Sequence, residues 1–196
     1  MLEMTKIRTT TKMISTIALA VTLLSPTTSS ASSASSMSYE VKHLDSHQKE
    51  VLRKTFWKAK EFDYQWTLSA IAWEESKFGK YPVNLSDPSC GAFHNLLKSV
   101  AKRVDYEVNK WNMSRICEYL IRDFDFSFSQ ALAELKYWEN YWRSKGLTGN
   151  KLWRRTIMSY NAGFNYKKGK NYLNRILKRI YILRKTFYDN SGDLKK

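Results

Sequence analysis

The chain has 196 residues, of which 33 are Lys or Arg and 18 are Asp or Glu, so it carries a formal charge of +15 at pH 7. Its two cysteines and three histidines form no HExxH pattern and no Cys/His cluster, which argues against a metal site. The sequence contains no G-x-S-x-G nucleophile elbow, no Walker loop and no internal repeat. We therefore expect neither a metal nor a cofactor.

Residues 1–34 do not read as part of a fold. Three basic residues precede an apolar run from Met13 to Leu24, which is followed by Pro26 and the small-residue tract TTSSASSASS. A bilayer span needs about 20 apolar residues, so this run is short for an anchor and typical of an export signal. Cleavage is expected after Ala31 or Ala34, and an uncleaved membrane anchor is the alternative. We predict an exported protein, periplasmic or extracellular, that contacts the membrane only during export.

The rest of the chain has the size of one domain. We predict a signal peptide over residues 1–31, a linker over 32–44, a domain over 45–188 and a basic tail over 189–196. Removal of the signal peptide takes away three basic residues and one acidic residue, which leaves 30 basic and 17 acidic residues, a formal charge of +13. This charge favours an anionic partner such as nucleic acid, a membrane surface or an acidic wall polymer. Export makes the wall the expected partner, and a basic surface without a specific partner is the alternative.

The domain is predicted to be mainly α-helical. Its apolar residues recur with the i, i+3, i+4, i+7 spacing of helices, and no long segment alternates with the period of two that a major sheet requires. Gly79 and Gly146 are well placed to end two of the helices. Helices are expected, in chain order, at about 45–60, 68–78, 95–103, 114–122, 128–142, 151–162 and 173–187.

Two adjacent glutamates, Glu74 and Glu75, lie in the second predicted helix. Glu75 follows Leu68 by seven residues and precedes Phe78 by three, near the middle of the apolar stripe, whereas Glu74 is displaced toward its flank. Burial and the negative end of the helix dipole both disfavour the ionised form of a carboxyl at this position. A carboxyl that keeps its proton is the group that a general acid requires. The alternative is that Glu75 sits at the edge of the core, paired with a Lys or Arg.

Cys90 and Cys117 are the two cysteines, and an exported chain meets conditions in which thiols can pair. One disulfide between them would stabilise the fold by about 3 kcal/mol on the loop-entropy estimate. Two separate buried thiols are the alternative.

Three short motifs occur in the order seen in a known family. The segment AIAWEESKFG (70–79) resembles A-I-A-x-x-E-S-x-F, SCGAFH (89–94) resembles S-x-G-L-M-Q, and SYNAGF (159–164) resembles A-Y-N-A-G. These motifs belong to the catalytic domain of soluble lytic transglycosylases, the lysozyme-like fold of bacterial and phage wall-cleaving enzymes. The resemblance covers roughly residues 62–185 and implies a single lysozyme-like domain of several helices.

The resemblance assigns roles to residues at matching positions. Glu75 would be the sole catalytic acid/base. Ser76 would begin the turn after it and steady the loop at the substrate site. Gly91 and Phe93 would line the substrate groove. Where the family has Gln, this chain has His94, whose ring offers a different set of donors and acceptors; a substrate-contacting and a purely structural histidine both remain open.

The third motif supplies two further candidates for substrate binding. Tyr160 and Asn161 would sit beside Glu75, with the tyrosine hydroxyl near the carboxylate and the amide near the sugar. Gly163 would end their helix.

The implied activity is that of a peptidoglycan lytic transglycosylase, which cleaves the β-1,4 bond between N-acetylmuramic acid and N-acetylglucosamine and leaves a 1,6-anhydro end. A hydrolase of the goose-type lysozyme sort is an alternative, with Asp87 as its second carboxylate. A non-catalytic wall-binding protein and an exported nucleic-acid-binding protein are the others. The expected partner is the peptidoglycan glycan strand and no nucleic acid, and the expected state is a monomer.

Overall fold

The computed structural model describes residues 41–189, which form a mainly α-helical fold, as predicted, together with a small antiparallel sheet. The predicted signal peptide, most of the predicted linker and nearly all of the basic tail lie outside these residues. Within them, no helix is both long and apolar enough to cross a membrane. The elements are α2 (Ser46–Lys60), α3 (Gln65–Ser76), β1 (Val83–Asn84), β2 (Ser89–Cys90), β3 (Asn95–Leu96), α4 (Leu97–Arg103), α5 (Lys110–Arg122), α6 (Phe124–Ser144), α7 (Gly149–Ala162), the 3-10 segment η1 (Gly163–Gly169) and α8 (Lys170–Asp189).

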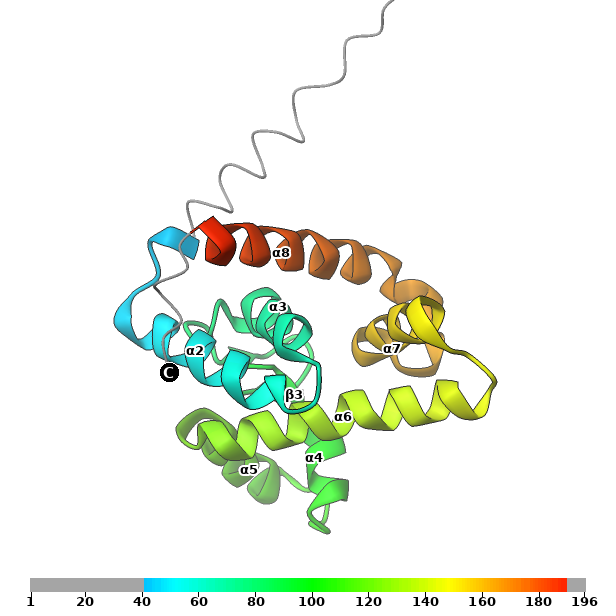
Figure 1. Cartoon of the computed structure of the whole chain (residues 1–196). Coiled ribbons are helices and arrows are strands. Elements are labelled where there is room, and N and C mark those ends of the chain that lie inside the picture. The colour runs from blue at the N-terminus through cyan, green and yellow to red at the C-terminus, as the bar shows by residue number, and fades with distance from the viewer. Residues whose placement is uncertain (1–40, 190–196) are drawn as a thin grey trace, which may run out of the picture.

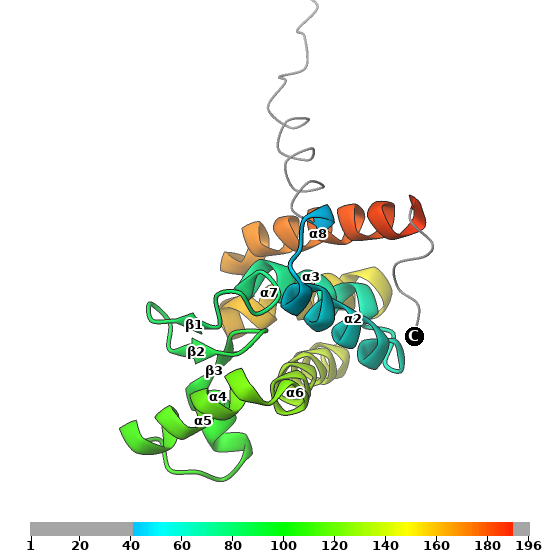
Figure 2. The ribbon, with the colours of Figure 1, turned by 90° about the vertical axis from the view of Figure 1, so that its left-hand side faces the viewer.

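Helix α3 lies at the centre of the fold, with α8 running across one side and α2 packed on another (Figure 1). Helix α6 passes along the opposite edge, and α7 packs back against it. The turned view places the three strands with α4 and α5 on one side of the molecule (Figure 2). Because α3 is held by both α2 and α8, helix packing determines where its C-terminal end lies.

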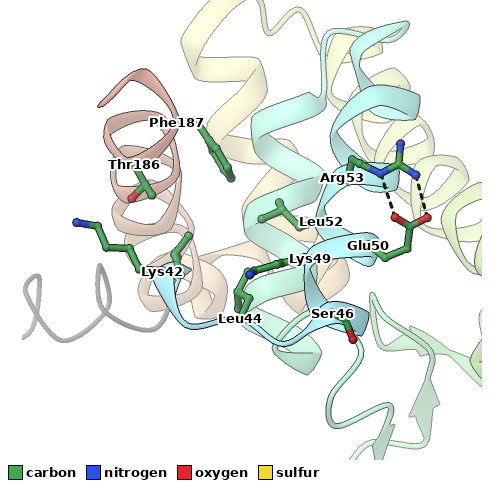
Figure 3. Close-up of a pocket in the computed structure, with 10 residues that line it drawn as sticks. Lys42, Leu44, Ser46, Lys49, Glu50, Leu52, Arg53, Thr186 and Phe187 are labelled. Atoms are coloured by element: carbon green, nitrogen blue, oxygen red, sulfur yellow. Dashed lines mark hydrogen bonds and ion pairs between the residues drawn. The ribbon is translucent and has the colours of Figure 1, made fainter. Parts of the chain in front are cut away.

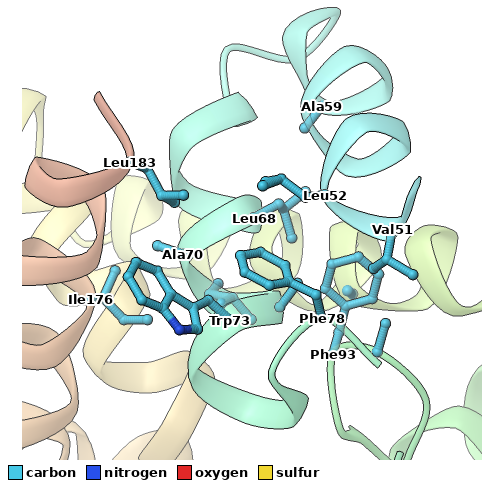
Figure 4. Packing of buried hydrophobic residues seen from close by; sticks show 14 of the residues in the cluster. Val51, Leu52, Ala59, Leu68, Ala70, Trp73, Phe78, Phe93, Ile176 and Leu183 are labelled. Atoms are coloured by element: carbon cyan, nitrogen blue, oxygen red, sulfur yellow. The ribbon is translucent and has the colours of Figure 1, made fainter. Parts of the chain in front are cut away.

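The core surrounds α3. Leu68, Ala70 and Ile71 are fully buried, and Trp73 is 1% exposed. A helix that is buried all round is a core helix, so the single apolar stripe predicted from the sequence understates its burial. Figure 4 shows these α3 side chains meeting residues of α2 and α8, among them Leu183.

The end of α3 lies earlier than predicted. The helix ends at Ser76, and the next three residues, Lys77, Phe78 and Gly79, all have positive φ angles. The Phe78 amide donates to the Ala72 carbonyl at 2.9 Å, which turns the chain back and leaves the Phe78 side chain fully buried. The prediction that Gly79 ends the helix was therefore wrong, because burial of Phe78 requires the turn to begin before it.

The boundary between linker and domain also needs correction. Val41 and Leu44, assigned to the predicted linker, are 6% and 8% exposed and belong to the main core cluster. Asp45 then caps α2: its carboxylate accepts from the Gln48 amide at 2.8 Å, and the Gln48 side chain accepts from the Asp45 amide. The folded part of the chain therefore includes residues 41–44.

Helices α5 and α6 begin four residues before the predicted positions. Asn109 caps α5 by accepting from the Asn112 amide, and Asp123 both ends α5 and caps α6 by accepting from the Phe126 amide, each at 2.9 Å. The first turns of both helices are largely exposed or half-buried. The apolar periodicity is therefore weak in these first turns, and the capping residues indicate more clearly where the two helices begin.

Strand β2 pairs with β1 and β3 and is joined to α5 by a disulfide between Cys90 and Cys117. This result decides between the two alternatives left open for the cysteines. Gly91, which follows β2, has a φ of 84°, and a Cβ there would come within 2.6 Å of the Leu120 carbonyl oxygen. Only glycine allows the strand to approach the end of α5 this closely.

Candidate active site

A pocket of about 300 Å³ contains the predicted catalytic glutamate. One side is formed by the small sheet and α4, and the other by α6 and the end of α7. The lining residues are Glu75, Asn84, Asp87, Ser89, His94, Asn95, Leu96, Ser99, Arg103, Glu134, Trp138, Ser159, Tyr160, Asn161 and Gly163. The structure thus brings Glu75, His94, and the adjacent pair Tyr160 and Asn161 together from three parts of the sequence.

Glu75 lies in the last turn of α3, and 18% of its side chain is exposed. The Tyr172 hydroxyl donates to its Oε1 at 2.6 Å, and His94 Nδ1 lies 3.5 Å from its Oε2. Among the described residues its ion-pair partner is this histidine and not a Lys or Arg. The alternative in which Glu75 is paired with a Lys or Arg is therefore not the one that the structure adopts.

His94 links Glu75 to the loop that follows α3. Its Nε2 lies 2.8 Å from the Tyr81 carbonyl oxygen, which can only accept, so Nε2 carries a hydrogen. Nδ1 then faces Glu75 Oε2 in one of two forms: as a lone pair toward a protonated carboxyl, or as an N–H toward a carboxylate. The 3.5 Å separation of these two atoms is that of an ion pair. His94 thus faces the Glu75 carboxyl as well as lining the pocket.

The environment of His94 favours its charged form. Burial acts to lower the pKa of His94, but the interactions with Glu75 and the Tyr81 carbonyl outweigh it, so the pKa is raised. The backbone at His94 has a φ of 44°, in the left-handed region that few residues other than glycine adopt. Such backbone strain occurs frequently at functional sites.

Glu74 has a different role from its neighbour. Its oxygens accept from Arg175 Nε at 2.6 Å and Arg179 Nε at 2.5 Å, and the Arg179 guanidinium lies 4.7 Å from the centre of the Trp73 ring. Burial acts to raise the pKa of Glu74, but the two arginines outweigh it and the pKa is lowered. Glu74 is therefore an ionised anchor between α3 and α8.

Tyr160 lies near Glu75, as the family resemblance implies, but its hydroxyl does not bond the carboxyl. Its hydroxyl donates to the Phe93 carbonyl at 3.2 Å, and the hydroxyl that bonds Glu75 comes from Tyr172 in α8. Burial, followed by the nearby charge of Glu75, raises the pKa of both tyrosines well above the usual value, so both stay protonated as donors. Tyr172 was not predicted as a site residue, and its one local signal is that it lies four residues before the buried Ile176.

Three predicted substrate-binding residues do not line the pocket. Ser76 is fully buried; its hydroxyl donates to the Ala92 carbonyl at 2.6 Å and accepts from the Gly79 amide at 2.7 Å. It does steady the turn, as expected, but it cannot touch a substrate. Gly91 and Phe93 are buried too, and the Phe93 ring packs against aromatic rings of α6. Both shape the loop that carries His94 and do not form the groove surface.

Two further carboxylates line the pocket. Asp87, the predicted second carboxylate of a hydrolase, is exposed on the loop before β2. Glu134 of α6 was missed, because it reads as an ordinary polar residue of an amphipathic helix. Its oxygens accept from Arg103 at 2.6 Å and from the Trp138 indole at 2.7 Å, so it is held in place on the α6 wall.

A larger cavity, of about 540 Å³, lies between α2 and the end of α8 (Figure 3). Among the described residues that line it, the one carboxylate is Glu50, which accepts two hydrogen bonds from Arg53, at 2.9 and 3.0 Å. The other charged lining residues are Lys42 and Lys49. Because this cavity has no carboxyl free to transfer a proton, the smaller Glu75 pocket is the candidate active site.

No family model matches the chain, and no solved structure matches it. The chain is 33% identical over 124 residues to an uncharacterized 20.7 kDa protein from the vs-regB intergenic region of Enterobacteria phage T4. This match covers 60% of the present chain and 61% of the phage protein. The likeness relates part of the chain to a phage protein and assigns no activity.

Proposed function

We propose that this protein is a peptidoglycan lytic transglycosylase with a lysozyme-like fold. The observation that carries the proposal is the position of Glu75: its carboxyl lines an open pocket, with one oxygen held by Tyr172 and the other facing His94. The three motifs that resemble the transglycosylase family also end at this pocket, through Glu75, His94 and Asn161. The proposed substrate is the β-1,4 bond between N-acetylmuramic acid and N-acetylglucosamine in the glycan strand.

The reaction needs one carboxyl that gives up a proton and then recovers it. Glu75 donates its proton to the glycosidic oxygen while the bond from that oxygen to C1 of muramic acid breaks, with oxocarbenium-like charge on the sugar. The Glu75 carboxylate then removes the proton from the C6 hydroxyl of the same sugar, and that oxygen bonds to C1. Glu75 ends protonated, no water is consumed, and the product carries a 1,6-anhydro end.

Tyr172 and His94 each interact with a different oxygen of the Glu75 carboxyl. The tyrosine hydroxyl occupies Oε1 as a donor, so the transferable proton of Glu75 resides on Oε2. His94 Nδ1 faces that oxygen at 3.5 Å. In this scheme the tyrosine orients the carboxyl, while the histidine keeps a proton available when the glycosidic oxygen arrives.

A hydrolase is the second candidate, and the two other carboxylates in the pocket favour it. Hydrolytic glycosidases pair an acid with a second carboxylate that activates water or attacks the sugar. Asp87 and Glu134 both line the pocket with Glu75. Of the two, Asp87 is the more accessible, because Glu134 is bonded to Arg103 and Trp138.

The product decides between the two reactions. Purified sacculi are digested with the protein, and the released muropeptides are analysed by mass and for reducing ends. A transglycosylase leaves products one water lighter than those of a hydrolase, without a reducing end at muramic acid. Asp87→Asn should retain most of the activity under our proposal. Reducing ends together with an inactive Asp87→Asn variant would establish the hydrolase instead.

A further inference from the structure

A cluster of aromatic side chains extends from the Glu75 pocket along α6 and η1. Trp138 lines the pocket and is 5% exposed. The rings of Tyr137, Tyr141 and Phe164 pack against it edge to face, at centroid distances of 4.9, 5.9 and 4.9 Å. Tyr141 and Phe164 also contact each other at 5.3 Å. These four rings form one continuous group, the aromatic ledge, which begins at the pocket wall.

The outer rings of the aromatic ledge face solvent. Phe164 is 65% exposed and Tyr137 is 51% exposed. Both rings pack on the same Trp138 ring. Burial of apolar surface provides about 25 cal/mol per Å², so exposed rings grouped in this way indicate a surface that binds something. Phe164 directly follows Gly163, a pocket-lining residue with a φ of 59°. The turn at Gly163 therefore places an exposed ring directly beside a pocket-lining residue.

The groups around the aromatic ledge suit a sugar ring. A pyranose has faces of C–H groups and a rim of hydroxyls and amides, which pair with aromatic rings and with polar side chains respectively. Asn161 is exposed and lines the pocket next to Gly163, where its amide can both donate and accept. The indole of Trp138 is fixed by its hydrogen bond to Glu134, so the ledge is rigid at its base.

We propose that the aromatic ledge binds a sugar of the peptidoglycan glycan strand beyond the bond held at Glu75, with Phe164 and Tyr137 as the contacting rings. This inference rests on the proposed function, because it takes the Glu75 pocket as the cleavage site. It adds a subsite on the η1 side, so that the strand runs from the small sheet across the pocket to the ledge.

Binding can be measured separately from cleavage. Glu75→Gln protein, which leaves the strand uncut, is titrated with peptide-free glycan strands prepared from purified sacculi, and the heat of binding is recorded. Phe164→Ala and Tyr137→Ala in this background should each weaken binding about tenfold, the effect of removing an aromatic side chain that carries binding energy. Tyr137→Phe keeps the ring and should keep the affinity. The matched control is Trp111→Ala, since Trp111 is 73% exposed on α5 and does not line the pocket.

The outcomes separate this inference from the proposed function. If wild-type protein cleaves sacculi but Phe164→Ala and Tyr137→Ala bind as tightly as their parent, the ledge assignment is wrong and the proposed function stands. An equal loss in Trp111→Ala also overturns the assignment. If wild-type protein does not cleave yet strand binding depends on the ledge, the ledge stands in a wall-binding protein and the proposed function fails. Absence of both cleavage and binding refutes both. Thermal unfolding of each variant confirms that the fold is retained.

Discussion

The Tyr172 hydroxyl donates a 2.6 Å hydrogen bond to Glu75 Oε1 and joins residues that lie 97 positions apart in the chain. Tyr172 lies in the first turn of α8, and Glu75 lies in the last turn of α3. The tyrosine is 2% exposed, so little water competes for this oxygen. The bond therefore sets the orientation of the carboxyl and leaves Oε2 as the oxygen that can exchange a proton in the pocket.

Replacing Glu75 by Gln should abolish cleavage while leaving the fold intact. The amide oxygen can still accept from Tyr172, but an amide cannot donate and then recover a proton. We expect the rate of sacculus digestion to fall by at least the 10²- to 10⁴-fold that is typical of general acid–base catalysis. Glu118→Gln, on the exposed face of α5, is the matched control and should keep wild-type activity. A Glu75→Gln variant that cleaves at the wild-type rate would show that Glu75 is not the general acid of either candidate mechanism.

Replacing Tyr172 by Phe should reduce the rate of cleavage about tenfold and lower the free energy of unfolding by about 1 kcal/mol, the net contribution of one hydrogen bond. The ring remains to fill the core, so the change isolates the hydroxyl. Tyr160→Phe removes a hydroxyl that bonds a backbone carbonyl and not Glu75, so it should affect the rate less. Steady-state kinetics on soluble muropeptides and urea unfolding measure the two effects. A greater rate loss in Tyr160→Phe would mean that Tyr172 does not orient the acid.

His94 should make a contribution to the free energy of unfolding that depends on pH. Its pKa in the folded protein is raised above the value of about 6.5 expected in the unfolded chain, so folding favours its protonated form. This contribution is fully present below about pH 6.5 and is lost as the pH rises through the folded pKa. The wild type should therefore lose stability relative to His94→Asn across that window. Asparagine suits the test because it tolerates the left-handed backbone at this position. Urea unfolding at a series of pH values measures the difference, and parallel curves for the two proteins would contradict it.

Replacing Glu74 by Gln should lower stability more than it lowers the activity of the folded protein. It leaves the side chain of Arg179, which is 6% exposed, without its anionic partner. Removal of one member of a buried ion pair typically costs about 3 kcal/mol. Urea unfolding at neutral pH gives the loss, with Glu118→Gln as an exposed control. If activity disappears while stability is unchanged, Glu74 and not Glu75 would be the residue that takes part in the reaction.

Local pattern in the sequence determined the helical class of the fold and selected Glu75. Apolar stripes marked the helices that became α3, α6 and α8, because burial of one face of a helix imposes its period on the sequence. The position of Glu75 inside the apolar stripe, followed by Ser76, distinguished it from Glu74. The sequence identified both cysteines but left open whether they form a disulfide. That depends on how β2 and α5 approach each other in space.

Only the tertiary structure decided which groups surround Glu75. Tyr172 and Glu134 contribute to the site through helices α8 and α6, and their local sequence marks them only as residues of amphipathic helices. The burial of Phe93 was hidden for the same reason, since its partners on α6 lie more than 30 residues along the chain. A sequence pattern reports which side of its own helix a residue faces. Contacts between distant elements depend on how the helices pack, so Glu75 could be chosen from the sequence while its hydrogen-bond donor and its pocket could not.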